Sequence, residues 1–262
     1  MEFAALAIWN EIQKRLLIFW DYRFNLIAQL VTVCLIFIGA GFLFGGGQFN
    51  PAQLASLLLA YIGWFYARIV ILSTGSDLVT EAQAGTLEQM YMSPAPASLL
   101  LFGRMLALLI STTFLVVPVA ILLVLLLKIP VPLRWEGLPV LLLTLIGLFG
   151  FTLILSGVGL VFKQTEALAD LIQNLLLFLT GVFLPVERFP AWLGAIARIF
   201  PITQGNIVLR DVMLKQQSLA SAWSDGSLIL LTVHTILYVC IGLLIFKWCE
   251  HIAKQAGSLG QY

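Results

Sequence analysis

The chain has 262 residues and a formal net charge of +1; 61% of its residues are hydrophobic and 10% are charged. Soluble domains are about half apolar and a quarter charged, so this composition excludes an ordinary soluble protein and predicts a single polytopic membrane domain over residues 1–262. The near-neutral charge and the lack of a dense Lys/Arg patch argue against nucleic acid as a partner.

The first predicted element is an amphipathic helix within residues 1–22. Apolar residues recur at helical spacing along it, while charged residues fall off that face. The apolar residues are Ile8, Ile12, Leu16 and Phe19. Because the segment carries Glu2, Glu11 and Asp21 and lacks a basic start followed by a short apolar core, we expect a helix in the membrane interface rather than a cleaved signal peptide.

Six apolar segments are predicted to cross the membrane, since a spanning helix needs about 20 apolar residues. Gly and Pro residues in 45–51 form a turn between the first two segments. The fifth segment is the shortest and contains Asp170. The segments are residues 24–44, 52–72, 99–127, 138–162, 168–184 and 227–246.

Basic residues set the expected orientation. Lys14, Arg15 and Arg23 precede the first segment, whereas the turn that follows it has no Lys or Arg. By the positive-inside rule the N-terminus is expected in the cytoplasm, and six crossings return the C-terminus to the same side. The sequence therefore predicts an integral protein of a bacterial plasma (inner) membrane with both termini cytoplasmic.

Polar and small residues inside the apolar segments are predicted to contact neighbouring helices or the membrane interface. Arg68 lies near the cytoplasmic end of its segment, so it is expected to extend its charge to the interface or to pair with an acid. His234 with its neighbouring threonines is expected to make a helix contact. Glycines of the fourth segment predict close helix packing. These glycines are Gly147, Gly150, Gly157 and Gly159.

The stretch 77–96, between the second and third segments, predicts a short capped helix on the cytoplasmic side. Thr86 and Gln89 form a capping box, Gly85 lets the chain turn in, and Pro94 ends the helix. Its apolar residues have no transmembrane neighbour of their own to cover, and acids stand beside them. The apolar residues are Leu87, Met90 and Tyr91, and the acids are Glu81 and Glu88. Such a helix is expected to contact a protein partner.

Residues 185–225 predict an outer region with two short helices that enter one leaflet without crossing it. Pro185, Pro190 and Pro201 divide amphipathic pieces that are too short to span. Trp192 belongs to the first piece and Arg210 to the second. We expect Arg210 to serve transport rather than assembly.

The order of these residues resembles a known family. Glu81, the run Gly85-Thr86-Leu87-Glu88-Gln89 and Ser93-Pro94 are similar to the coupling-helix region of ABC-2-type permeases. Leu184-Pro185, Phe189-Pro190, Trp192-Leu193, Phe200-Pro201-Ile202-Thr203 and Leu209-Arg210 resemble the same family's outward-facing region. The resemblance covers nearly the whole chain and implies an all-α permease subunit of an ABC exporter.

The resemblance also implies partners and site residues. A cytoplasmic ATPase subunit would dock on Glu81, Gly85, Thr86, Leu87, Glu88, Gln89 and Tyr91, with help from the N-terminal helix. Two permease subunits, identical or paralogous, would form the path among membrane lipids. Pro185, Pro190, Trp192, Pro201 and Arg210 would form an outer gate.

Energy is expected to come from the partner. The sequence has no GxxxxGK[ST] phosphate loop and no Gly-Lys dipeptide, so ATP and Mg²⁺ would bind the ATPase subunit and this chain would hold no cofactor. Nor does it predict a catalytic or metal site: Cys34, Cys240 and Cys249 have no ligand spacing. The chain is therefore not expected to be an enzyme by itself.

The sequence fits two other functions less well. An ion-coupled secondary transporter would show internal repeats and acids at the midplane, and neither is visible. An intramembrane hydrolase would have to use Ser156 with His234, which lack a nucleophile turn and an orienting group. The sparse polar groups of the apolar segments favour an amphipathic or lipid-linked substrate, and leave open whether it is a drug, a lipid or a polysaccharide.

Overall fold

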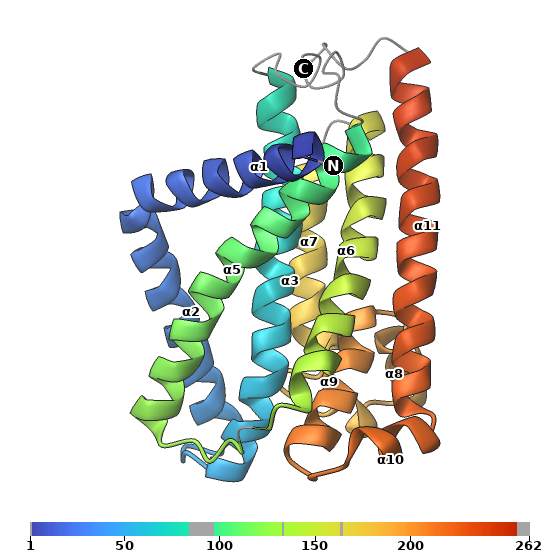
Figure 1. Ribbon diagram of the computed structural model, residues 1–262. Coiled ribbons are helices and arrows are strands. Elements are labelled where there is room, and N and C mark those ends of the chain that lie inside the picture. Colours follow the sequence, from blue (N-terminus) through green and yellow to red (C-terminus); the bar gives the residue numbers. More distant parts are fainter. Residues whose placement is uncertain (1, 84–96, 133, 163–164, 256–262) are drawn as a thin grey trace.

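The computed structural model describes residues 2–83, 97–132, 134–162 and 165–255 (Figure 1). All regular structure in these residues is helical, which confirms the all-α class. A short 3₁₀ helix, Val186–Arg188, separates α7 from α8. The α-helices are α1 (Glu2–Asp21), α2 (Arg23–Phe44), α3 (Pro51–Gln83), α5 (Ala97–Leu127), α6 (Gly137–Phe162), α7 (Thr165–Leu179), α8 (Ala191–Ala197), α9 (Pro201–Met213), α10 (Leu219–Ser224) and α11 (Ser227–Gln255).

Five of the described helices, α2, α3, α5, α6 and α11, are long and apolar enough to cross a membrane. The chain is therefore an integral membrane protein, but the expected count of six spans is not confirmed. The segment expected as the fifth span is α7, which has 15 residues. Such a helix is about 22 Å long, whereas the hydrocarbon core of a bilayer is about 30 Å thick.

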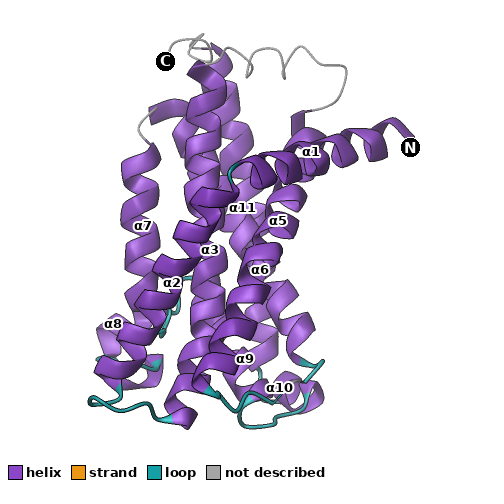
Figure 2. Ribbon diagram, turned by 90° about the vertical axis from the view of Figure 1, so that its left-hand side faces the viewer, coloured by secondary structure: helices purple, strands orange, loops and turns teal. Residues whose placement is uncertain are grey.

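The helices give the bundle two different ends (Figures 1 and 2). At one end α1 lies across the bundle and packs against α5. Helices α3 and α11 also end on this side of the bundle. At the opposite end lie α8, α9 and α10. The start of α1 and the end of α11 are thus on the same side of the bundle.

Helix α3 forms the centre of the bundle. It packs against α2, α5, α6, α7 and α9, and its aromatic side chains Tyr61, Trp64 and Phe65 are at most 1% exposed. Phe37 of α2 meets the Tyr61 ring at 5.2 Å, edge to face, and Tyr61 meets Trp64 at 5.1 Å. Aromatic pairs in these arrangements stabilise beyond their buried area, so buried aromatic packing helps to hold α3 in the centre of the bundle.

Helices α6 and α11 pack backbone to backbone through glycines, as the glycines of the fourth segment predicted. A Cβ atom added at Gly150 would overlap the backbone of Tyr238 and Val239, and one at Gly242 would overlap the carbonyl oxygen of Gly150. A Cβ at Gly157 would lie 3.0 Å from the Cα of Phe246. Small residues allow this close approach, which favours helix association in lipid, where helices gain little from the hydrophobic effect.

A Gly242→Ala substitution is expected to destabilise the bundle by about 1 to 3 kcal/mol, the usual cost of overpacking. The new methyl group meets backbone rather than a flexible side chain, so α6 and α11 have to separate. The measurement is the fraction of monodisperse protein after heating in detergent. Gly39→Ala is the matched control, since a Cβ at Gly39 meets nothing within 4 Å. Equal heat resistance of the two variants would show that this interface is loose.

Candidate functional site

The outer segment is divided by its prolines, as expected. Pro190 is the N-cap residue of α8 and Pro201 is the first residue of α9. Proline suits these positions because its fixed φ is helical and its missing N–H has no partner in the first turn. Residues 189–214 are therefore not one continuous helix, and their position in a leaflet stays a prediction.

Helix α9 is inside the protein, which the sequence did not reveal. All its residues except Ile207 and Asp211 are buried, including Thr203, Asn206 and Arg210. It packs against α3, α6 and α11, and glycines permit this: a Cβ at Gly205 would overlap the Thr144 side chain. A helix with this many polar groups can be buried only if those groups find partners.

Two side chains of α9 donate to backbone carbonyls beyond the end of α7, and one of them also donates to a carbonyl of α3. Asn206 Nδ2 donates to the Thr180 carbonyl at 3.1 Å. Arg210 Nη2 donates to the Gly181 carbonyl, and Arg210 Nε donates to the Ser56 carbonyl at 3.2 Å. The carbonyls at a helix end need partners when water is excluded, and a cation there also interacts favourably with the helix dipole. These bonds explain how α7 can stop inside the bundle.

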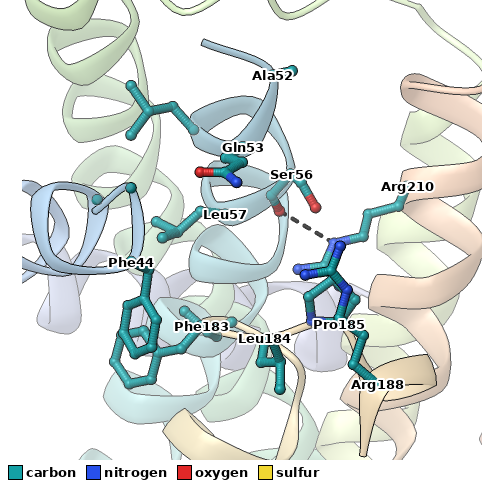
Figure 3. Close-up of a pocket in the computed structure, with 14 residues that line it drawn as sticks. Phe44, Ala52, Gln53, Ser56, Leu57, Phe183, Leu184, Pro185, Arg188 and Arg210 are labelled. Carbon is teal, nitrogen blue, oxygen red and sulfur yellow. Dashed lines mark hydrogen bonds between the residues drawn. The ribbon is translucent and has the colours of Figure 1, made fainter. Parts of the chain in front are cut away.

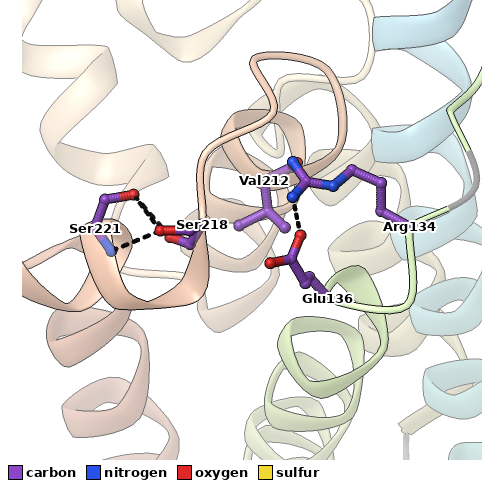
Figure 4. A network of polar contacts seen from close by, with 5 residues as sticks. All are labelled: Arg134, Glu136, Val212, Ser218 and Ser221. Atoms are coloured by element: carbon purple, nitrogen blue, oxygen red, sulfur yellow. Dashed lines mark hydrogen bonds and ion pairs between the residues drawn. The ribbon is translucent and has the colours of Figure 1, made fainter.

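The carboxyl end of α9 has a similar arrangement (Figure 4). Arg134 Nη1 donates to the Val212 carbonyl at 3.1 Å, and Arg134 also forms an ion pair with Glu136. Nearby, Ser218 caps α10 by accepting from the Ser221 N–H at 3.2 Å. The loop before α6 therefore anchors α9 at this end.

A cavity of about 280 Å³ opens beside Arg210 (Figure 3). We call it the outer arginine cavity. It lies between the end of α2, the start of α3 and residues 182–185. Its polar groups come from Gln53, Ser56, Arg188 and Arg210, and its apolar groups include Phe44 and Phe183. Figure 3 shows the two arginines on one side of the cavity and the two phenylalanines on the other.

The outer arginine cavity is positively charged. Arg210 is 9% exposed, and the acids whose charge acts on it are Glu187 and Asp211. An arginine stays protonated in proteins. Asp211 is engaged by Lys215 at 2.7 Å, and hydrogen bonding to Asp211 raises the pKa of Lys215. Two guanidinium groups therefore face the cavity.

The expected outer-gate residues do not form one cluster. Pro185 and Arg210 both line the outer arginine cavity. Trp192 is 67% exposed on α8, and Pro190 is exposed before it. Pro201 is buried against Gly147 of α6. No sequence pattern pointed to Ser56, Gly181 and Asn206. Ser56 and Gly181 are hydrogen-bonded to Arg210, and Asn206 to Thr180, and in each pair the two residues are far apart in the chain.

Most of the expected ATPase-docking segment lies outside the described residues, namely Gly85, Thr86, Leu87, Glu88, Gln89 and Tyr91. Glu81 belongs to the last turns of α3, at the end of the bundle where α1 lies. Helix α1 is attached there to α5: Glu11 pairs with Arg104 at 3.8 Å, and a Cβ at Gly103 would lie 3.2 Å from the Cα of Ile8.

Arg68 pairs with an amide rather than with an acid of the described residues. Its Nη1 donates to Gln173 Oε1 of α7 at 3.3 Å, and its guanidinium lies 5.6 Å from the centre of the Trp64 ring. Trp64 Nε1 donates to the Gln173 carbonyl at 2.9 Å. Arg68 therefore helps to join α3 to α7.

Ser156 and His234 cannot form a catalytic pair in this structure. Ser156 Oγ donates to the Thr152 carbonyl at 2.8 Å. Thr235, next to His234, packs at Gly147, whereas Phe246 packs at Gly157, next to Ser156. At a rise of about 1.5 Å per residue, Thr235 and Phe246 are about 16 Å apart along the axis of α11, so His234 and Ser156 lie at different heights in the bundle. This geometry argues against the hydrolase.

Comparison with protein families matches residues 7–214 to the family described as ABC-2 type transporter. No curated protein matches the chain. The matched residues run from α1 to the residue that follows α9. They include the outer arginine cavity and also α1, the end of α3 and the start of α5, which together we call the platform. Because the match covers well over half of the chain, this protein belongs to the ABC-2 type transporter family and is the transmembrane permease component of an ABC transporter.

Proposed function

We propose that this permease moves an amphipathic or lipid-linked substrate out of the cytoplasm or the inner leaflet, with ATP and Mg²⁺ bound by a separate ATPase subunit. Two permease subunits, identical or paralogous, would enclose the path. The family match supports a permease that works with an ATPase. The spanning helices carry few polar side chains, which favours an amphiphile over a small ion as the substrate.

The observation that carries this proposal is the platform at the end of the bundle that holds α1. Helix α1 lies across this end, where α3 ends and α5 begins, and the segment resembling a coupling helix comes between these two helices in the sequence. The Glu11–Arg104 pair and the close contact at Gly103 join α1 to α5. A subunit that pushed on this platform would move α3 and α5 together, and α3 is the central helix of the bundle.

The platform is proposed to face the cytoplasm of a bacterial inner membrane. Helix α1, which carries Lys14 and Arg15, lies at this end, and α2 begins with Arg23. By the positive-inside rule these basic residues favour the cytoplasm on this side. We also propose that α7, extended by the buried α9, completes a sixth crossing. The bonds from Asn206 and Arg210 support this, because they leave the carbonyls after α7 satisfied inside the bundle.

The test is to purify the permease from its native membrane in mild detergent and to identify what comes with it. We expect an ATPase subunit in a defined ratio and ATP hydrolysis that amphiphiles stimulate. A permease that transports in proteoliposomes with an ion gradient and no ATPase would instead be a secondary transporter, and the proposal would be wrong.

The orientation of the permease is tested in intact cells that express a cysteine-free variant into which single cysteines are introduced. A cysteine at Gln89 should resist a membrane-impermeant thiol reagent, whereas a cysteine at Ala220, an exposed residue of α10, should react. The reverse pattern would place the platform outside and remove the ATPase proposal.

A further inference from the structure

Some guanidinium N–H groups in the outer arginine cavity are not hydrogen-bonded to any described residue. Arg210 has five N–H groups, and two of its nitrogens are engaged, by the carbonyls of Ser56 and Gly181. Its third nitrogen, Nη1, has no hydrogen-bond partner among the described residues. Arg188 lines the same cavity and forms no ion pair with a described acid. Arg210 is buried, and a buried cation without an ion pair is costly. An anion that enters the cavity would gain both guanidinium groups as partners.

Side chains beside the arginines complete the polar wall. Gln53 and Ser56 line the cavity from the first turns of α3. Arginine favours planar, bidentate recognition of carboxylate and phosphate groups. At about 280 Å³ the cavity is just below the size of sites that enclose a whole small molecule, which start at roughly 300 Å³. It suits the headgroup of a larger molecule better than the entire molecule.

An aromatic surface leads away from this polar wall. Phe44 and Phe183 line the cavity and stack with their ring centres 5.1 Å apart. Phe183 also meets Phe178 of α7 at 5.5 Å, edge to face. Phe44 is 54% exposed and Phe178 is 62% exposed. The aromatic surface therefore begins inside the cavity and continues onto the outside of the bundle.

We propose that the outer arginine cavity binds the phosphate or carboxylate headgroup of an anionic amphiphile, whose apolar part lies along Phe183 and Phe178. The cations would hold the headgroup, and the aromatic surface distinguishes an amphiphile from a free anion. The inference deepens the proposed function and rests on it where the amphiphile is taken to be the substrate. Binding itself needs no ATPase.

Binding is measured on the purified full-length permease in phosphatidylcholine nanodiscs. The probes are a fluorescent lysophosphatidic acid, a lysophosphatidylcholine with the same chain, and inorganic phosphate as competitor. We expect the anionic probe to bind at least about tenfold more tightly than the zwitterionic one, and millimolar inorganic phosphate to displace it poorly. A preference below twofold would overturn the proposal.

Arg188→Gln is the decisive variant, because Arg188 is exposed and its loss should not affect folding. It should weaken binding of the anionic probe about tenfold. Arg198→Gln, which removes an exposed arginine outside the cavity, should leave binding unchanged. Equal loss in both variants would show diffuse attraction to basic surface and would overturn the site.

Phe178→Ala separates an amphiphile from a simple anion. It should weaken binding of lysophosphatidic acid several-fold and leave any binding of inorganic phosphate unchanged. If Phe178→Ala has no effect and phosphate competes as well as the lipid, the cavity is a free-anion site. A permease that binds the lipid as expected but copurifies with no ATPase would keep this site and lose the proposed function.

Discussion

Replacement of Arg210 by Ala is expected to lower the free energy of unfolding of the permease by about 1 to 3 kcal/mol. The buried Gly181 carbonyl loses its donor and the part-buried Ser56 carbonyl loses one hydrogen bond, and a buried polar group left unsatisfied costs about 1 to 3 kcal/mol. The carboxyl end of α7 also loses the positive charge beside it. The measurement is the midpoint of thermal unfolding in detergent, together with the yield of monodisperse protein.

Two further variants show whether this effect comes from the hydrogen bonds. Arg210→Lys keeps the charge but cannot reach both carbonyls with one ammonium group, so it should recover part of the lost stability. Arg198→Ala removes an exposed arginine and should change the midpoint little. If Arg210→Ala unfolds at the wild-type midpoint and loses only transport, then Arg210 contributes to transport and not to stability, as the sequence suggested.

Replacement of Glu88 by Lys is expected to reduce the amount of ATPase subunit that copurifies with the permease by about tenfold at low ionic strength. The substitution places a cation at the positive end of the expected short helix and reverses the charge offered to the partner. Because salt screens such charges over about 10 Å at 0.1 M, the defect should be smaller at high salt. The retained ATPase is measured at two salt concentrations.

Leu87→Ala and Thr86→Ala are the comparison for the charge effect. Leu87→Ala removes packing and should act equally at both salt concentrations. Thr86→Ala removes a helix cap worth about 1 kcal/mol and should lower transport more than expression. Wild-type partner binding and transport in all three variants would mean that this segment is an ordinary surface helix.

Much of the fold could be predicted from local sequence. The apolar segments 24–44, 99–127 and 138–162 each end within a few residues of α2, α5 and α6, because a break in hydrophobicity or a Gly/Pro turn stops a spanning helix at that point. Pro190 and Pro201 likewise begin the two helices that their backbone restrictions predicted.

Local patterns could not locate the candidate site, since its groups are distant in the chain. Apolar composition continued past Leu179 and so predicted a longer span, but α7 ends there. Amphipathicity predicted that α9 enters one leaflet, but it gave no sign that nearly all of the helix is buried in the bundle. The reason is the same in both cases: backbone carbonyls have no side-chain signature that would mark them as acceptors.

The sequence by itself determined that this is an all-helical membrane protein, and the family match then made it an ABC-2 type permease. Helical periodicity and the length of apolar runs are local properties, so they can be read along the chain. Only the tertiary structure brought Arg210 to Ser56, 154 residues away, and to Gly181, 29 residues away. Burial then decided their role, because a polar group removed from solvent has to find its partner in the protein.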